Sequence, residues 1–466
     1  MSSLPLPSPR TAAVPDDRRW VLALTALASF MVALDAMVVT TALGAMRVEL
    51  RASVTELEWI VNAYNLSFAV LLLTGAALGD RFGRRRGLMA GLGLFVAASL
   101  GCALAPSAGW LIAARALQGA GAALVMPLAM VMLGMAFPGP ARAKALGMFG
   151  SVTGLALIVG PAVGGAIAQG LAWQWIFWIN LPIGLVAMFL MRRHLPESRG
   201  AALPLDLGGL ALATLAALAA VWALVRGHHA GWTSGEVLAA VIVTVLALVA
   251  FLYWERRAVA PMVPLRLFGA RRLSAGMAAS FLFYAPMYAT VFFLPQFFQQ
   301  AQGLGAWDAG LRLIPWTATL FVIGPLAGKL VQRLGERRLV SAGAAMQGLG
   351  LAWVAWLARD ASVPFVQMVP ALLVSGIGVS LAMPAAQNAV LSAVAPPEMG
   401  KASGLFNVFR YLGGVFGIAL LVEVFAWRSA GGAPYAPGFS AALSIGAGLS
   451  LLGASAGMCL PAHNVP

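Results

Sequence analysis

The chain has 466 residues, of which 61% are hydrophobic and 10% are charged. A soluble globular chain carries roughly 25% charged residues, so this composition excludes a soluble domain and indicates a membrane protein. The net charge of +14 does not by itself indicate a nucleic-acid partner, because the basic residues are placed as membrane topology requires.

Apolar stretches of about 18 residues or more recur along the whole chain, and each can cross ~30 Å of hydrocarbon as a helix. Residues 1–19 form a polar, Pro-rich tail. The apolar run from Trp20 is too long for a cleaved signal segment, so we expect it to be a retained first span. Fourteen spans are predicted, at 20–44, 58–79, 87–106, 110–134, 145–169, 175–191, 207–226, 236–253, 274–296, 308–326, 339–358, 364–388, 403–425 and 438–460. The predicted fold class is therefore an all-α polytopic membrane protein.

The placement of Lys and Arg predicts the orientation. If the N-terminus is cytoplasmic, most of the 30 basic residues fall in cytoplasmic segments. The outer side then holds only Arg47, Arg51, Arg226, Arg359 and Arg428. We expect a multi-pass protein of the cell membrane, in a bacterium the inner membrane, with both termini in the cytoplasm and no nucleic-acid partner.

An internal repeat divides the chain. Residues 119–127 read GAGAALVMP and residues 376–384 read GIGVSLAMP, and ALG at 145–147 matches ASG at 402–404 at the same offset. Transporters built from repeats place their substrate site between the two halves, near the bilayer midplane. We predict a cytoplasmic tail at 1–19, a six-helix half at 20–191, an inserted helix pair with basic flanks at 192–273 and a second six-helix half at 274–466.

Short polar and glycine-rich motifs lie on particular spans. The loop after the second span reads GDRFGRRR (79–86), the fourth span holds RALQGAG (115–121), and the fifth holds Gly154 followed by GPAVGG (160–165). The sixth span begins WQWIFWINLPIG (173–184), and the first contains Leu34 and Asp35. In this order, these motifs resemble the fourteen-helix drug/proton antiporter family of the major facilitator superfamily, and the resemblance covers nearly the whole chain.

The resemblance implies a major facilitator fold of two six-helix halves plus two inserted helices. It implies a proton-coupled antiporter that exports amphipathic drugs or toxic compounds by alternating access. A dedicated exporter of one metabolite or of a self-made antibiotic would have the same fold. The implied partners are an amphipathic small molecule, protons and the lipid bilayer, with no cofactor and no particular oligomer. Departures from the family pattern at Ala76, Thr40 and Gly44 bear on the substrate rather than on the fold.

Two charged residues are buried deep in the predicted spans of the first half. A charge at the depth of Asp35 costs roughly 2.5–3.5 kcal/mol or more. We predict that its carboxylate faces the central cavity and exchanges a proton; the alternative is a hydrogen-bonded Asp that only helps packing. The resemblance implicates Arg115 in proton transfer, and a pairing with a carboxylate or snorkelling to the outer surface are physical alternatives. Leu372 at the matching position of the second half favours a functional role for Arg115.

The thirteenth predicted span carries two further candidates. Glu423 is the other deep acid and is a candidate for binding protons or cationic substrates, although an interfacial Glu explains it almost as well. Arg410 resembles a family arginine that precedes Gly413 and Gly414, and snorkelling to the cytoplasmic surface is the alternative.

The inner loop and the fifth span carry candidates for conformational control. The resemblance implies that loop residues form a charge latch, with the arginines facing acids across the gap between the halves; the alternative is topogenic charge alone. The latch residues are Asp80, Arg81, Gly83, Arg84 and Arg85. The small residues of the fifth span allow close helix packing and a bend, and in the family they mark antiporters. These residues are Gly154, Gly160, Pro161, Gly164 and Gly165.

The sequence lacks the motifs that are typical of other functional classes. We find no repeated filter loop of a channel, no nucleophile–base or metal-ligand cluster of an enzyme, and no nucleotide-binding Gly-x4-Gly-Lys-Ser/Thr loop. Cys102 and Cys459 lie in apolar runs and are expected to be free thiols. A proton symporter is opposed only by the glycine–proline motif of the fifth span, through the resemblance.

Overall fold

The computed structural model describes residues 15–137, 140–200, 206–259, 261–394, 398–429 and 434–461, and these residues are helical with short connections and no strand. The elements of the first part of the chain are α1 (Pro15–Glu49), α2 (Val54–Phe82), α3 (Arg84–Ala103), α4 (Ala108–Ala136), α5 (Pro140–Gly170), α6 (Trp175–Trp178), α7 (Asn180–His194), α8 (Leu207–Ala230) and α9 (Gly235–Arg257). Those that follow are the 3-10 helix η1 (Leu265–Gly269), α10 (Arg271–Gln296), the π-helix η2 (Phe297–Ala301), α11 (Ala306–Leu311), α12 (Ile314–Thr317), α13 (Thr319–Leu334), α14 (Glu336–Leu357), α15 (Phe365–Leu391), α16 (Met399–Arg428) and α17 (Tyr435–Met458).

Twelve helices among the described residues are long and apolar enough to cross a membrane. A thirteenth crossing results if the bent pair Ala306–Gly324 and Leu326–Leu334, which meet at 44°, is one span. The remaining expected span, 145–169, falls on the 31-residue helix α5, which is not among the twelve. The prediction of an all-helical polytopic membrane protein is therefore confirmed, whereas the count of fourteen spans is not.

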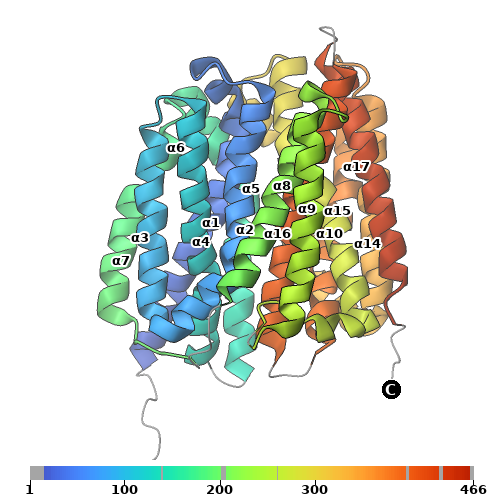
Figure 1. Ribbon diagram of the computed structural model, residues 1–466. Coiled ribbons are helices and arrows are strands. Elements are labelled where there is room, and N and C mark those ends of the chain that lie inside the picture. Colours follow the sequence, from blue (N-terminus) through green and yellow to red (C-terminus); the bar gives the residue numbers. More distant parts are fainter. Residues whose placement is uncertain are drawn as a thin grey trace, which may run out of the picture.

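The helices gather into two bundles with a helix pair between them. Figure 1 shows α1–α7 on one side, which we call the N-terminal bundle, and α10–α17 on the other, which we call the C-terminal bundle. Helices α8 and α9 pack on each other, and α8 contacts both α2 and α16. The inserted pair therefore lies across the boundary where the two bundles meet.

The helices differ in how much of their surface is buried within the protein. Helix α10 is enclosed, with 83% of its most apolar window buried, whereas only 17% of the corresponding window of α9 is buried. Because α9 is also the most apolar span, its exposed leucines and valines are suited to lipid contact.

Local sequence sets the ends of α2. Ser53 and Glu56 form a capping box, in which the Ser53 hydroxyl accepts from the Glu56 amide at 3.2 Å and the Glu56 carboxylate accepts from the Ser53 amide at 2.8 Å. The helix ends at Phe82 and is capped by Gly83, whose φ of 115° is disfavoured for residues with a side chain. The chain then turns directly into α3.

The internal repeat is visible in the packing. Gly121 of α4 lies so close to α3 that an added Cβ would be 2.6 Å from the amide nitrogen of Phe95. At the matching position of the repeat, Gly378 of α15 approaches α14, and a Cβ there would be 2.5 Å from the amide nitrogen of Gln347. Both bundles therefore contain a helix pair in direct backbone contact, which requires small residues at the crossing.

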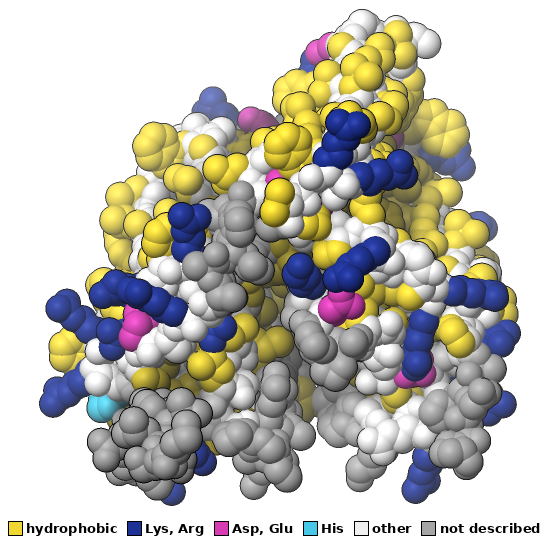
Figure 2. Space-filling model, turned by 60° about the horizontal axis from the view of Figure 1, so that its bottom comes forward, with side chains coloured by type: hydrophobic (Ala, Val, Ile, Leu, Met, Phe, Trp, Pro, Cys, Tyr) yellow, Lys and Arg dark blue, Asp and Glu magenta, His cyan; other side chains and the backbone are white. Residues whose placement is uncertain are grey.

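Helix α1 begins and helix α17 ends on the same face, the lower one in Figure 1. Figure 2 brings that face forward and shows Lys and Arg side chains over both bundles. The connections α1–α2 and α9–η1 lie on opposite faces, because the chain traverses the bundle an odd number of times between them. The traversing segments are α2, α3, α4, α5, α6 together with α7, α8 and α9.

The two faces should be distinguishable by thiol labelling. In a Cys459→Ser background, Val48→Cys and Val259→Cys place single exposed thiols on opposite faces, since these positions are 80% and 98% exposed. We expect a membrane-impermeant maleimide to label one variant in sealed vesicles and the other only after permeabilisation. The native Cys102 is fully buried and serves as the unlabelled control; labelling of both variants from one side would contradict the topology.

Candidate functional site

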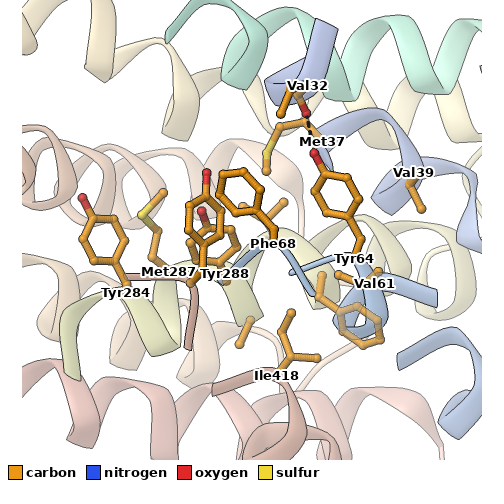
Figure 3. Close-up of a cluster of buried hydrophobic side chains, with 14 of the residues drawn as sticks. Val32, Met37, Val39, Val61, Tyr64, Phe68, Tyr284, Met287, Tyr288 and Ile418 are labelled. Atoms are coloured by element: carbon orange, nitrogen blue, oxygen red, sulfur yellow. Dashed lines mark hydrogen bonds between the residues drawn. The ribbon is translucent and has the colours of Figure 1, made fainter. Parts of the chain in front are cut away.

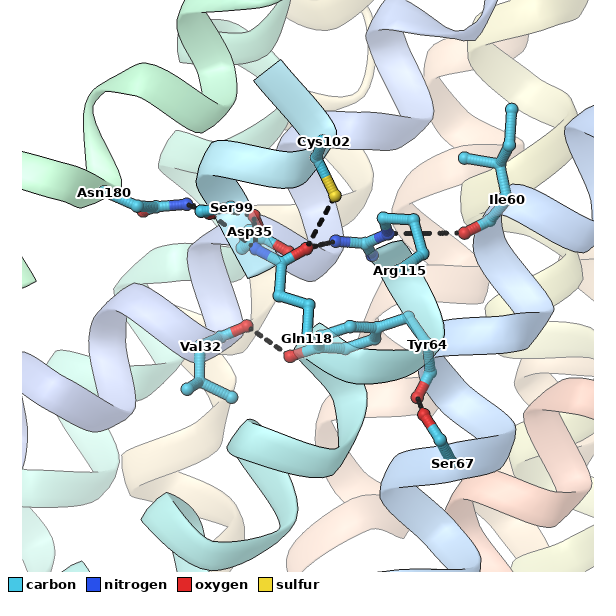
Figure 4. Close-up of polar contacts among 10 residues, drawn as sticks. All are labelled: Val32, Asp35, Ile60, Tyr64, Ser67, Ser99, Cys102, Arg115, Gln118 and Asn180. Atoms are coloured by element: carbon cyan, nitrogen blue, oxygen red, sulfur yellow. Dashed lines mark hydrogen bonds and ion pairs between the residues drawn. The ribbon is translucent and has the colours of Figure 1, made fainter. Parts of the chain in front are cut away.

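Asp35 and Arg115 form a buried ion pair inside the N-terminal bundle. Asp35 on α1 and Arg115 on α4 are 3% and 1% exposed, and an Arg115 Nη1 donates to the Asp35 carboxylate. Figure 4 shows the two side chains pointing toward each other. Charges removed from water in this way persist only when they are paired and hydrogen-bonded.

Neutral polar side chains complete the shell of this pair. The amides of Gln118 and Asn180 donate to Asp35 Oδ1 at 2.9 and 3.1 Å. The same two amides donate to the Ser99 hydroxyl at 2.8 and 2.9 Å. The carboxylate of Asp35 therefore accepts three hydrogen bonds, from α4 and α7.

Arg115 is held from its other side by α2. Its Nε donates to the carbonyl of Ile60 at 3.3 Å, and its guanidinium lies 4.2 Å from the centre of the Tyr64 ring. The Tyr64 hydroxyl donates to the Val32 carbonyl of α1 at 3.0 Å. Gly119 permits this approach of α4 to α2, because a Cβ there would be 3.0 Å from the Tyr64 carbonyl carbon.

The sequence predicted the depth of these two residues but not all of their surroundings. Pairing of Arg115 with a carboxylate is what the structure shows. The Asp35 carboxylate, in contrast, faces into its own bundle, where its partners lie on α4 and α7. Gln118 and Asn180 stand in motifs that the sequence analysis quoted, while Ser99 carries no sequence signal that would have singled it out.

The two candidates of α16 lie apart from this pair and from each other. Arg410 contacts aromatic rings, at 5.2 Å from the centres of both Tyr284 and Tyr411. Glu423 lies near the other end of α16, where its charge acts on Glu58 of α2. Glu58 is only 1% exposed, but its sequence position gave no sign of this, because it stands at the expected start of a span, where an acid is ordinary.

The basic loop between α2 and α3 is held by the chain that follows α7. Arg84 pairs with Asp80 at 2.7 Å, and the Glu197 carboxylate accepts from the Arg85 amide at 3.0 Å and pairs with the Arg85 guanidinium at 3.7 Å. A Cβ at Gly83 would be 2.8 Å from Glu197 Oε1. The acid that meets these arginines thus comes from the connection after α7, which the sequence analysis did not single out, and not from the C-terminal bundle.

Helix α5 brings the two bundles together through its small residues. An added Cβ at Gly160 would be 2.5 Å from Met37 Cβ of α1, and one at Gly165 would be 2.9 Å from Trp307 Cα of α11. Gly164 contacts α1 in the same way, at Thr41 and Val38. Gly310 of α11 in turn meets the carbonyl of Pro161. The motif therefore lies where α5 contacts the C-terminal bundle, and Gly154 lies on the same helix.

A cavity of about 370 Å³ lies between the bundles. Helices α2, α4 and α5 line one side of it, for example with Phe68 and Met126, and α16 lines the other with Gly404 and Asn407. Asp80 and Lys401 stand at its loop end. Its walls are mostly apolar with a few polar groups, as in small-molecule sites.

Comparison with known families agrees with this architecture. The family model described as Major Facilitator Superfamily matches residues 25–418. The chain belongs to the major facilitator superfamily. It is accordingly a multi-pass membrane transporter and not an enzyme.

Characterised relatives of this superfamily member are export and resistance proteins. A cephamycin export protein of Amycolatopsis lactamdurans is 38% identical, with 86% of this chain and 84% of the relative aligned. A methylenomycin A resistance protein of Streptomyces coelicolor is 34% identical, with 85% and 84% aligned. A multidrug resistance protein of Mycobacterium tuberculosis is 32% identical, with 88% and 76% aligned.

Solved structures of superfamily transporters share the fold at low sequence identity. A peptide transporter in complex with sulfate superposes with a TM-score of 0.69 at 16% identity, covering 95% of this chain and 93% of that one. A D-xylose–proton symporter superposes with a TM-score of 0.68 at 16% identity, covering 94% and 96%.

Breaking the Asp35–Arg115 pair should destabilise this superfamily member strongly. Asp35→Asn leaves the Arg115 charge uncompensated, and Arg115→Gln leaves the Asp35 charge uncompensated; each should lower the free energy of unfolding by roughly 3–5 kcal/mol. The double variant leaves no buried charge, so its loss should be well below the sum of the two single losses. Thermal unfolding of the detergent-solubilised protein measures all three.

A surface ion pair provides the matched control. Arg226 and Glu236 pair at 2.9 Å but are 39% and 42% exposed. Glu236→Gln should therefore cost less than about 1 kcal/mol. Additive losses for the Asp35 and Arg115 variants would contradict direct pairing.

Proposed function

We propose that this protein is a proton-coupled antiporter that exports amphipathic small molecules across the cytoplasmic membrane by alternating access. The observation that carries the proposal is the buried Asp35–Arg115 pair with its shell of amide donors. Relatives named for cephamycin export, multidrug resistance and methylenomycin A resistance support the direction of transport and the substrate class.

The pair supplies a physical means of coupling. Protonation of Asp35 removes its negative charge, and the buried guanidinium of Arg115 then lacks a counter-charge. Because Asp35 lies on α1 and Arg115 on α4, that change favours a rearrangement of these helices. The carboxylate is only 3% exposed here, so a proton reaches it only in another conformation, which limits proton leak.

The basic loop between α2 and α3 and the glycine-rich motif of α5 have roles in the same transport cycle. We propose that Asp80, Arg81, Gly83, Arg84 and Arg85 form a latch that stabilises one conformation, with Glu197 as the acid that holds it. We further propose that the α5 motif, Gly154, Gly160, Pro161, Gly164 and Gly165, seals the bundles at the end opposite the cavity, because α5 and α11 touch there.

The remaining architectural predictions belong to the same proposal. We propose fourteen spans, with halves at 20–191 and 274–466, an inserted pair at 192–273 and both termini in the cytoplasm. The 31-residue length of α5 supports the additional span, and the Lys and Arg on the face where α17 ends support the orientation. We assign Glu423 to proton or substrate binding, because it adds a second acid beside the buried Glu58.

A dedicated exporter is the second candidate. The relative with 38% identity is named for the export of cephamycin, one antibiotic class. In this version the same fold and the same proton coupling serve a single metabolite, and the difference lies in the breadth of substrates.

Reconstitution in liposomes tests the coupling. We expect an imposed pH gradient to drive uptake of ethidium, a permanent cation, or of naphthalene-2-sulfonate, a permanent anion, and we expect Asp35→Asn to reduce the gradient-driven rate at least about tenfold. Glu236→Gln, which neutralises a surface acid, is the matched control and should retain the wild-type rate.

Each outcome has a defined meaning. Gradient-driven movement that survives in a folded Asp35→Asn protein would remove Asp35 as the coupling residue. Downhill movement that ignores the pH gradient would contradict antiport altogether. Movement of only one compound among many would favour the dedicated exporter.

A further inference from the structure

Two arginines within the spans, Arg115 and Arg410, differ in how their charge is compensated. Arg115 pairs with Asp35. No carboxylate among the described residues pairs with Arg410, and the polar groups that act on it are the hydroxyls of Tyr284, Tyr288 and Tyr411. Its Nε has no hydrogen-bond partner. An uncompensated cation at this depth is costly, so its retention points to an anion that is not part of the chain.

Aromatic rings surround Arg410. The centres of the Tyr284 and Tyr411 rings each lie 5.2 Å from its guanidinium carbon. Tyr288 stands beside both tyrosines, at 6.4 Å from Tyr284 and 6.0 Å from Tyr411 between ring centres. Figure 3 shows Tyr284, Met287, Tyr288, Phe68 and Tyr64 following one another in a row. We call Arg410, Tyr284, Tyr288 and Tyr411 the tyrosine cage.

A close contact between α16 and α10 builds the cage. Gly414, one turn after Arg410, faces Tyr288, and a Cβ there would be 2.8 Å from the Tyr288 ring. Gly413 also lies close to α10, because a Cβ added there would be 2.6 Å from the Phe281 carbonyl oxygen. These two glycines bring the guanidinium against tyrosines of the neighbouring helix, and Tyr284 is left with a buried hydroxyl that has no hydrogen-bond partner.

The cage borders the cavity between the bundles. Asn407, one turn before Arg410 on α16, lines that cavity together with Phe68. The Phe68 ring meets the Tyr411 ring edge-on, with 4.2 Å between the centres. Arg410 itself is partly exposed, although it lies within a span. A molecule in the cavity can therefore reach the guanidinium past Asn407 and Phe68.

The acids of the cavity lining already have donors within the chain. Asp80 pairs with Arg84 at 2.7 Å. Asp206 accepts from the Gly209 amide at 2.7 Å and from the Trp254 indole at 2.6 Å. Both acids are thus occupied by donors of the chain, while Lys401 adds a further positive charge to the lining.

We propose that the tyrosine cage binds an oxyanion group of the exported molecule, a carboxylate or sulfonate carried on an apolar, ring-containing body. Arg410 supplies charge-assisted hydrogen bonds to the oxyanion, and the Tyr284 hydroxyl donates another. The apolar body lies in the cavity against Phe68 and the tyrosine rings. This inference rests on the proposed export function and gives it a substrate class, acidic amphiphiles.

Equilibrium binding to the full-length protein in detergent, without any gradient, tests the site. The probes are 2-naphthoate, 2-naphthamide and 2-naphthylmethylammonium, which share one ring system and differ in charge. We expect the wild type to bind 2-naphthoate most tightly. Arg410→Gln should weaken 2-naphthoate binding roughly ten- to a hundred-fold and leave 2-naphthamide binding unchanged, and Arg410→Lys should fall between.

Arg312 offers the matched control. It also lies in the C-terminal bundle between two rings, at 5.4 Å from Phe298 and 4.9 Å from Phe365, but it donates to Gln302 and does not line the cavity. Arg312→Gln removes the same charge and should not change 2-naphthoate binding. If Arg410→Gln fails to fold, Tyr284→Phe keeps the ring, removes the unpaired hydroxyl and should weaken only 2-naphthoate binding.

The outcomes separate this site from the coupling mechanism. Three results would each overturn the anion site. The wild type could bind the anionic and neutral probes equally well, Arg410→Gln could weaken the binding of all probes equally, or Arg312→Gln could weaken 2-naphthoate binding as much as Arg410→Gln does. Selective binding of 2-naphthoate together with transport that ignores the pH gradient would keep the site and refute proton coupling. Gradient-driven transport without anion-selective binding would keep proton coupling and refute the anion site.

Discussion

The buried ion pair between Asp35 and Arg115 determines how the N-terminal bundle can be built. A full charge in this setting needs a counter-charge and a complete set of hydrogen bonds, and no single helix can provide them. The bundle therefore brings α1, α3, α4 and α7 to one point, with Gln118 and Asn180 filling the remaining acceptor sites of the carboxylate. The close glycine contacts of α4 follow from the same need, because its polar side chains must reach across to the neighbouring helices.

The repeat shows which part of this arrangement the fold needs and which part is specific to one half. Gly121 and Gly378 occupy matched positions, and both hold a helix pair in backbone contact. The polar pair has no counterpart: Leu372 replaces Arg115, and Ser375, which accepts from the Trp316 indole at 3.1 Å, replaces Gln118. Packing is therefore common to both halves, whereas an ion pair at these repeat positions occurs only in the first. The C-terminal bundle instead carries Arg410, which pairs with no carboxylate among the described residues.

The sequence predicted what depends on composition along the chain and missed what depends on the direction of a side chain around its helix. Apolar lengths, basic loops and the repeat predicted the helices and the depth of Asp35, Arg115 and Arg410. They could not show that Asp35 points into its own bundle, because the depth of a residue in the bilayer does not determine which side of its helix faces which neighbour. Glu197 and Glu58 were missed for a related reason: each looks like an ordinary surface acid until a distant segment of the chain packs on it.

The position of α8 constrains how the two bundles can move. It contacts α2 and α16, the two helices that face each other across the cavity, and its N-terminus begins at Asp206, which lines that cavity. If the bundles rock against each other, α8 must slide along at least one of these helices. Its contacts there are apolar, with Val221 and Val225 packed among Leu66, Val70, Val415 and Ala419. Apolar contacts have no fixed direction and tolerate sliding better than hydrogen bonds. The inserted pair can thus cover the boundary against lipid without locking it. The ionic contacts of Glu197 lie within the N-terminal bundle, and the close backbone contact between the two bundles lies in the seam between α5 and α11.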